Sequence, residues 1–184
     1  MRKIIAGFAI SLDGFMEGPN GEYDWITNDP EHFKELARTW ENTDAFFYGR
    51  KTYEMSMAMS KKPGKGKKQN NPFAHMKHYI FSNTLESEGD EFILVRGDIK
   101  TEVTKIKNQP GKDIMVFGGA HLAGSLMDMG LVDEVGVGIC PVLLGSGKPF
   151  FKGIGKRIDL TLADSKVYAS GLVALTYTVK KKRG

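Results

Sequence analysis

The sequence predicts one α/β domain, in which helices are layered on a mostly parallel sheet with an antiparallel hairpin at its edge. Short apolar strands alternate with helical segments between Lys3 and Val142, and two strand-like runs near the C-terminus flank a turn. The length of 184 residues fits one domain and suffices for an ordinary hydrophobic core. We therefore predict a single domain over residues 1–180, followed by a basic tail at 181–184.

The N-terminal half begins with an apolar run from Lys3 to Leu12, which ends at Asp13-Gly14 and is typical of a buried strand. A helix is expected after Asp29-Pro30, because Asp caps free N–H groups and Pro suits the first helical position. One apolar stripe follows at helical spacing: Phe33, Leu36, Ala37 and Trp40. Further strands are predicted at 44–48, 78–81 and 92–95, with a helix at 52–59.

The C-terminal half is predicted from its glycines and its alternation. A helix at 101–108 stops before Pro110, and a short apolar strand at 114–117 runs into Gly118-Gly119. A helix at 120–129 and a strand at 133–142 follow. The runs 159–168 and 172–180 read as a hairpin around Ala169-Ser170-Gly171, because the second run alternates apolar and polar residues.

The net charge of +4 does not indicate a nucleic-acid partner. Nucleic-acid binders usually carry their cations as a stripe on a folded face, with aromatic residues between them. Here nine cations lie in a loop and in the tail, and the rest of the chain has an excess of acidic residues. The nine are Lys61, Lys62, Lys65, Lys67, Lys68, Lys180, Lys181, Lys182 and Arg183. The loop is expected to be solvated, with a phosphate-attracting lid as the alternative.

Cellular location is predicted from what the sequence contains. No apolar run approaches the roughly 18 residues of a membrane span, and no signal-like core is followed by a cleavage site. The single cysteine, Cys140, lies in an apolar run and is expected to be a buried, inert thiol. We therefore expect a cytoplasmic protein with no membrane partner. Four scattered histidines without carboxylate neighbours predict no metal site.

Three strand-to-turn junctions are marked by glycine: Gly49-Arg50-Lys51-Thr52, Gly118-Gly119 and Gly145-Ser146-Gly147. A glycine between a strand and a helix lets a ligand approach the backbone, and the helix N-terminus then suits a phosphate. Such ligands gather at the carboxyl ends of the strands. Glycine is also common in caps and turns, and the two commonest nucleotide signatures, G-x-G-x-x-G and the P-loop, are absent. These observations alone indicate a possible dinucleotide-binding domain.

An ordered series of motifs spans nearly the whole chain. The chain thereby resembles the dihydrofolate-reductase-like family, in particular the reductase domain of the bacterial riboflavin-biosynthesis deaminase/reductase and its stand-alone relatives. The motifs are Ser11-Leu12-Asp13-Gly14-Phe15, Trp25-Ile26-Thr27, Gly49-Arg50-Lys51-Thr52-Tyr53-Glu54, Val116-Phe117-Gly118-Gly119-Ala120 and Pro141-Val142-Leu143-Leu144-Gly145. The most specific of these motifs are the block from Gly49 to Glu54 and the Gly118-Gly119-Ala120 block, in this order; the Ser11-Leu12-Asp13-Gly14 motif alone is not specific.

The resemblance implies a mixed, mostly parallel eight-stranded sheet and NADPH lying across the carboxyl ends of its strands. It implies that Arg50 is a candidate for the 2′-phosphate and that Asp13 and Trp25 lie near substrate and nicotinamide. It also implies a homodimer. The implied cofactor-binding residues are Gly49, Arg50, Lys51 and Thr52 at the phosphates, Ser82 and Asn83 at the adenosine, and Gly118, Gly119, Ala120 and Leu122 at the pyrophosphate and nicotinamide.

The predicted activity is hydride transfer from NADPH to a pteridine- or pyrimidine-like substrate, as in 5-amino-6-(5-phosphoribosylamino)uracil reductase. A dihydrofolate reductase and a non-catalytic NADPH-binding sensor are the alternatives. Neither Asp29 nor Glu31 aligns cleanly with the carboxylate that dihydrofolate reductases carry on their first helix. The source of the proton stays open: it is Asp13, a carboxylate near Asp29, or water. Three of these side chains also have structural alternatives: Asp13 as a turn cap, Trp25 as core and Asp29 as a helix cap. His121, in the first turn of the helix at 120–129, is expected to be a surface residue, with cofactor contact as the alternative.

Overall fold

The computed structural model describes residues 1–60, 73, 75–86 and 92–180. Its main sheet has eight strands in the order β5-β4-β3-β6-β1-β7-β10-β9. The strands are β1 (Ile4–Ser11), β3 (Thr43–Gly49), β4 (Lys77–Phe81), β5 (Phe92–Val95), β6 (Asp113–Gly118), β7 (Glu134–Cys140), β9 (Leu160–Val167) and β10 (Val173–Val179). All neighbours from β5 to β7 are parallel, and β10 pairs antiparallel with both β7 and β9. The predicted sheet and C-terminal hairpin are confirmed.

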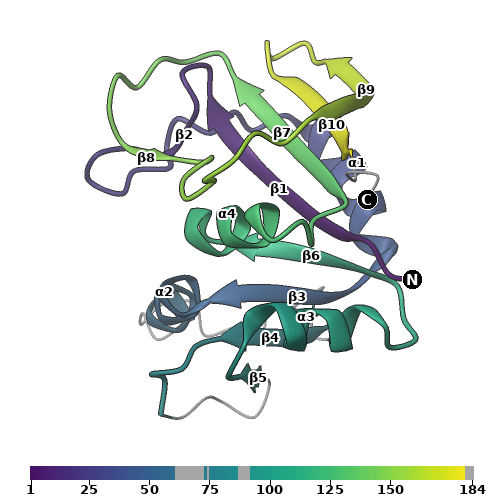
Figure 1. The fold of residues 1–184 in the computed structure, drawn as a ribbon. Helices are drawn as coiled ribbons and strands as arrows, with labels where there is room; N and C mark the ends of the chain where they lie inside the picture. The colour runs from purple at the N-terminus through teal and green to yellow at the C-terminus, as the bar shows by residue number, and fades with distance from the viewer. Residues whose placement is uncertain (61–72, 74, 87–91, 181–184) are drawn as a thin grey trace.

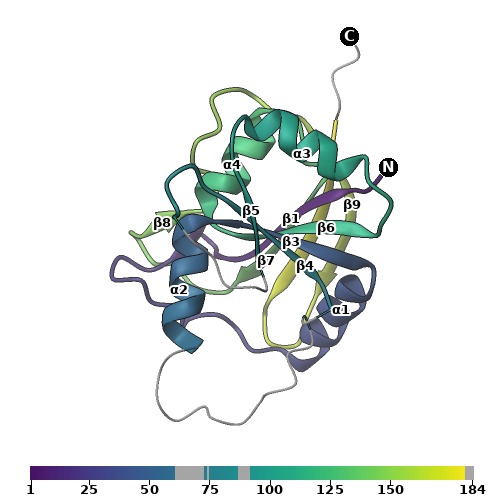
Figure 2. The ribbon, with the colours of Figure 1, turned by 90° about the horizontal axis from the view of Figure 1, so that it is seen from below.

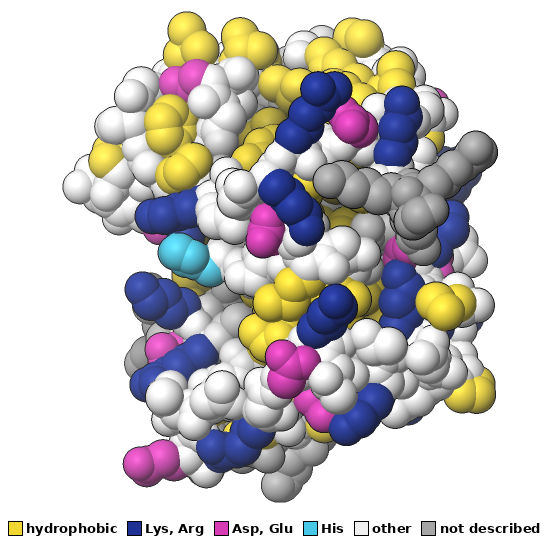
Figure 3. Space-filling model, in the orientation of Figure 1, with side chains coloured by type: hydrophobic (Ala, Val, Ile, Leu, Met, Phe, Trp, Pro, Cys, Tyr) yellow, Lys and Arg dark blue, Asp and Glu magenta, His cyan; other side chains and the backbone are white. Residues whose placement is uncertain are grey.

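In the described residues, four helices cover the sheet: α1 (Pro30–Glu41), α2 (Arg50–Ser60), α3 (Ile99–Lys107) and α4 (Ala120–Asp128). Helices α1 and α2 lie on one face, and α3 and α4 lie on the other (Figures 1 and 2). On the α3/α4 face, Lys and Arg side chains lie among acidic and neutral ones without forming a continuous stripe (Figure 3).

The central strand β3 shows why the sequence forms this layered core. Its alternate residues face opposite sides: Phe47 belongs to the large apolar cluster under α3 and α4, whereas Phe46 and Tyr48 belong to a second cluster on the other face. Both faces of a parallel sheet are buried, so such a strand is apolar throughout rather than alternating.

The apolar stripe predicted on α1 is only partly buried. Trp40 packs against the second cluster, but Phe33 is 43% exposed. The helix packs against β3, and its N-terminal residues Glu31 and Glu35 contact Lys166 of β9.

A second, two-stranded sheet was not predicted. It joins β2 (Phe15–Glu17) to β8 (Lys148–Pro149). Strands of three and two residues are too short for an alternating pattern to indicate them. The lysines at 61–68 and the tail at 181–184 lie outside the described residues. No helix in the described part of the chain has the length and apolar character needed to cross a membrane.

Candidate cofactor and substrate site

Six neighbouring parallel strands have their carboxyl ends on the same side of the sheet, and their last residues delimit the candidate site. We call this side, where these strands end, the sheet edge. The last residues are Val95, Phe81, Gly49, Gly118, Ser11 and Cys140. The adjacent strands β3 and β6 continue into helices on opposite faces, α2 and α4 respectively (Figure 2). In open α/β sheets ligands bind at such a switch point, outside the carboxyl ends of the strands.

The helix N-termini after β3 and β6 meet at this switch point. A Cβ placed on Gly119 would lie 3.3 Å from Thr52 Oγ1, so the first turn of α2 approaches the backbone that opens α4. Gly119 begins α4 without a side-chain hydrogen bond from any described residue, whereas Asp29 caps α1 and Asp98 caps α3. Two motifs that are far apart in the sequence are therefore adjacent, and the first amides of α4 have no capping side chain.

Arg50 and Lys51 open α2 with exposed side chains. Arg50 Nε donates to Glu54 Oε1 at 2.6 Å, and its Nη1 donates to Thr84 Oγ1 at 2.7 Å. The first contact is an exposed i,i+4 ion pair, which contributes little to stability. The second links α2 to the segment that follows β4.

A small cavity lies at the ends of β4 and β5, where the adenosine was expected. Its volume is about 130 Å³, and its lining is Phe81, Ser82, Asn83, Val95, Gly97 and Ile99. Ser82 Oγ accepts hydrogen bonds from the amides of Thr84 (3.2 Å) and Leu85 (3.0 Å). Asn83 Oδ1 accepts from Gly97 N at 2.9 Å, so the two predicted residues shape one wall of the cavity.

Ala120 and Leu122 are in the first turn of α4, but their side chains are buried. Leu122 belongs to the large apolar cluster, and its side chain packs into the core. The side chain of His121, between them, is exposed. A contact from Ala120 or Leu122 to a cofactor would therefore have to come from the main chain.

Asp13 lies at the end of β1 and holds a neighbouring loop. Its carboxylate accepts from Ser11 Oγ (2.6 Å), Leu144 N (3.2 Å) and Gly145 N (2.8 Å). The hydrogen bond from Ser11, followed by those from the two amides, lowers the pKa of Asp13 below its ordinary value. These contacts make Asp13 a cap of the loop after β7, a different segment from the turn at Gly14 that the sequence suggested.

Trp25 is half-buried, and its indole packs with a small cluster built on Cys140, Tyr168 and Leu172. Its Nε1 donates to Glu22 O at 3.0 Å. Both the apolar face and the N–H group of the ring are thus used within the fold. Cys140 is buried, as expected for an inert thiol.

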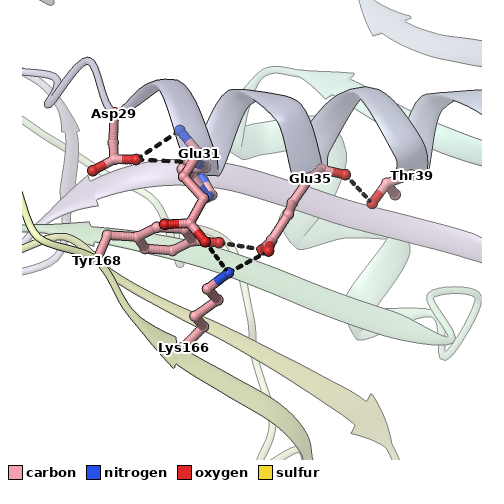
Figure 4. A network of polar contacts seen from close by, with 7 residues as sticks. Asp29, Glu31, Glu35, Thr39, Lys166 and Tyr168 are labelled. Atoms are coloured by element: carbon pink, nitrogen blue, oxygen red, sulfur yellow. Dashed lines mark hydrogen bonds and ion pairs between the residues drawn. The ribbon is translucent and has the colours of Figure 1, made fainter.

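Figure 4 shows a polar network between α1 and the hairpin of β9 and β10, which the sequence did not predict. Lys166 Nζ contacts Glu31 (2.8 Å) and Glu35, and Tyr168 Oη donates to Glu35. The hydrogen bonds from Lys166 and Tyr168 lower the pKa of Glu35. Burial, together with the hydrogen bond to Glu35, raises the pKa of Tyr168 to about 12. The network joins residues that are more than 130 positions apart, and no local sequence pattern predicts such pairs.

Two further α1 residues complete this region. Asp29 accepts from Glu31 N and His32 N, both at 3.0 Å, as the predicted helix cap. A hydrogen bond from Ser170, followed by the bond from His32 N, lowers the pKa of Asp29. The His32 ring lies against Tyr168, with 5.1 Å between centroids, and burial lowers its pKa. Within the described ranges, no group of three or more His, Cys, Asp or Glu residues is arranged to hold a metal ion.

Comparison with known proteins agrees with this architecture. The chain is 37% identical to the uncharacterized protein YyaP of Bacillus subtilis over 96% of this chain and 94% of that protein. A putative riboflavin biosynthesis protein from Shewanella sp. PV-4 superimposes with a TM-score of 0.82, at 22% identity, over 97% of this chain and 99% of that one.

The fold is dihydrofolate-reductase-like, as predicted. Dihydrofolate reductase from Enterococcus faecalis, solved with NADP(H), superimposes with a TM-score of 0.65 at 14% identity, over 97% of both chains. The family model of the RibD C-terminal domain matches residues 2–174. The chain therefore belongs to the RibD C-terminal domain family.

Proposed function

We propose that this protein is an NADPH-dependent reductase that transfers a hydride to a pteridine- or pyrimidine-like substrate, resembling 5-amino-6-(5-phosphoribosylamino)uracil reductase. One observation carries the proposal: the α2 and α4 N-termini meet at the switch point between β3 and β6, with Thr52 Oγ1 beside Gly119. The Enterococcus relative of the same fold was solved with NADP(H), which supports the choice of cofactor.

The residues at the sheet edge fit a dinucleotide. The amides at Gly119 and Ala120 would hold the pyrophosphate, because α4 starts there without a capping side chain and its N-terminus favours anions. The Thr52 hydroxyl would donate a hydrogen bond to the same pyrophosphate. The cavity between β4 and β5 would take the adenine, since Phe81, Val95 and Ile99 supply apolar walls.

NADPH, when bound, supplies the hydride, and the protein orients two planar rings and excludes water. Three proton sources were expected: Asp13, a carboxylate near Asp29, and water. The hydrogen bonds to Asp13 and Asp29 stabilise their ionised forms and lower both pKa values, so neither carboxyl is suited to donate a proton near neutral pH. We therefore assign Asp13 to positioning the Leu144–Gly145 loop, and we favour water as the proton source.

Steady-state absorbance of NADPH tests the proposal. The purified protein is mixed with NADPH and a panel of ribosylaminopyrimidines and dihydropteridines. Oxidation with the pyrimidines supports the proposal, and oxidation with dihydrofolate alone supports the dihydrofolate reductase alternative. Tight NADPH binding with no oxidation across the panel would favour the non-catalytic sensor. A homodimer in the cytoplasm is part of the same proposal, and sedimentation of the purified protein tests its oligomeric state.

A further inference from the structure

Strand β9 is the last strand at one end of the main sheet, and its outer side pairs with no described strand (Figure 1). Exposed apolar side chains lie on it: Leu162 is 52% exposed and Val167 is 74% exposed. Both point to the same face, because their β10 partners, Tyr177 and Val173, are four residues apart. Outermost strands of soluble proteins are usually short or protected by charges, and β5 at the other end has only four residues. An outermost strand of eight residues with exposed apolar side chains is a surface suited to strand pairing.

The ladder between β9 and β10 shows which backbone groups of β9 are free to pair. Tyr168 N donates to Leu172 O at 2.9 Å, so the backbone of Tyr168 faces β10. Because these groups alternate along an antiparallel strand, those of Ser165 and Val167 point away from the sheet. A bulge at Ala163 ends this regular stretch. A further strand would therefore pair with residues 164–167.

Charge selects one register in which a second copy of β9 fits this stretch. In an antiparallel pair of identical strands, a two-fold axis can pass through residue 164, 165 or 166. An axis at Asp164 or at Lys166 would set that residue opposite its own copy, and like charges directly opposite each other are destabilising. An axis at Ser165 sets Asp164 of each copy opposite Lys166 of the other. It also pairs the outward backbone groups of the two Ser165 residues.

Both charges have bonding capacity for such a contact. Lys166 Nζ contacts Glu31 at 2.8 Å and also Glu35, which leaves one of its three N–H groups (Figure 4). Asp164 is exposed and takes part in no ion pair with the described residues. The charges of this strand are therefore complementary to those of its own copy.

We propose that β9 is the interface of a homodimer, in which two copies pair antiparallel about a two-fold axis at Ser165 and join their sheets into one. Each copy offers the same surface, as an isologous contact requires. Two ion pairs between Asp164 and Lys166 flank the axis, and Val167 of each copy covers the bulge of the other. This inference rests on the proposed function for the homodimer alone, and it assumes neither NADPH nor an activity.

A cysteine at the axis tests the register. Opposite Cα atoms in a hydrogen-bonded antiparallel pair are about 5.5 Å apart, a distance that suits a disulfide. The full chain carrying Ser165→Cys should therefore form a disulfide-linked dimer with diamide, and dithiothreitol should reverse it. Thr161→Cys is the matched control on the same exposed strand. Its two copies would lie about 27 Å apart along the strands and should not cross-link. Cys140 is buried in both variants.

Sedimentation velocity tests the ion pairs without a cross-link. We expect the unmodified protein to sediment as a dimer, and Asp164→Lys, which sets lysines opposite each other, to raise the dimerisation Kd at least about tenfold. Asp159→Lys makes the same charge change at an exposed position just before β9 and should leave the Kd unchanged.

The outcomes separate this interface from the rest of the proposed function. A dimer that survives Asp164→Lys, or that cross-links equally well through Thr161→Cys, would contradict the interface and leave the homodimer standing. An unmodified protein that stays monomeric would contradict both. Oxidation of NADPH is measured separately, so its absence would overturn the proposed activity and not this interface.

Discussion

Two halves of the sheet edge, one at the ends of β3 and β6 and the other at the ends of β1 and β7, differ in whether their polar groups already have partners within the protein. On the β3–β6 side, α4 begins without a side-chain cap, Gly119 leaves space beside Thr52, and Arg50 and Lys51 are exposed. On the β1–β7 side, the side chains predicted to be catalytic already have partners: Asp13 accepts three hydrogen bonds, and Trp25 packs in a small cluster. The first half has groups available for a ligand, whereas the second half is held by its own contacts.

Under the proposed function, this difference separates the residues that would bind the cofactor from those that hold the substrate side in place. Changes on the β3–β6 side should alter affinity for NADPH with little effect on stability. Changes at Asp13 or at the α1–hairpin junction should alter stability first. Four variants separate these expectations.

The largest effect is expected for Gly119→Ala. Gly119 has φ −105° and ψ −176°, which alanine also adopts, so the backbone itself permits the change. The added Cβ would lie 3.3 Å from Thr52 Oγ1, at the point where the two helix N-termini meet. We expect the Kd for NADPH to rise at least about tenfold, which corresponds to about 1.4 kcal/mol.

The control for this variant is Gly155→Ala, where the nearest atom to an added Cβ is Asp128 Oδ1 at 3.7 Å, an ordinary contact. Both variants are titrated with NADPH and melted in parallel. An unchanged Kd for Gly119→Ala, at a normal melting temperature, would remove the α2–α4 junction from the cofactor site.

Arg50→Ala should have an effect of similar size on NADPH. Loss of a charge-assisted hydrogen bond to the 2′-phosphate should weaken NADPH about tenfold to a hundredfold and leave NADH almost unchanged. Its exposed ion pair with Glu54 should contribute little to stability. Titration with both cofactors measures this, with Glu54→Gln as the control for the lost pair. Equal losses for NADPH and NADH would exclude Arg50 from the 2′-phosphate.

Asp13→Asn should act mainly on stability. The asparagine amide would place donor hydrogens toward one of the backbone N–H groups of Leu144 and Gly145, which now donate to the carboxylate. We expect the melting temperature to fall by a few degrees, while turnover per folded molecule stays near that of the unmodified protein. Asp164→Asn, at an exposed position on β9, is the control. Lost turnover at an unchanged melting temperature would restore Asp13 as a catalytic residue.

The smallest effect concerns pH and His32. Burial lowers the pKa of His32 below its ordinary value of 6.5, so the unfolded chain binds the proton more readily than the folded one. Stability should therefore fall as the pH drops below about 6.5. Asp29 and Glu35 face this ring and favour its charged form, which limits the loss. Denaturation midpoints at pH 5 and pH 7.5 should differ less for His32→Gln than for the unmodified protein, and equal differences would contradict this reading.

The sequence predicted the strands of the main sheet, the helices and the glycine-marked junctions because these features depend on local periodicity and backbone geometry. Asp29-Pro30 predicted the start of α1, and the alternation after Gly171 predicted β10. The sequence could not predict that Asp13 bonds the loop after β7, or that Lys166 and Tyr168 meet Glu35, because these contacts join positions more than 130 residues apart. It also could not predict that Arg96 donates to Asn83 O and Leu85 O, because these contacts form only when β4 and β5 pair.

Hydrogen–deuterium exchange with and without NADPH tests most directly the central claim that the β3–β6 half of the sheet edge binds the cofactor. We expect slower amide exchange on NADPH addition at residues 49–53, 82–85 and 118–122. Exchange should be unchanged in β9 and β10, the last two strands of the sheet on the side away from β5. Protection confined to other segments, or no protection at saturating NADPH, would contradict the account.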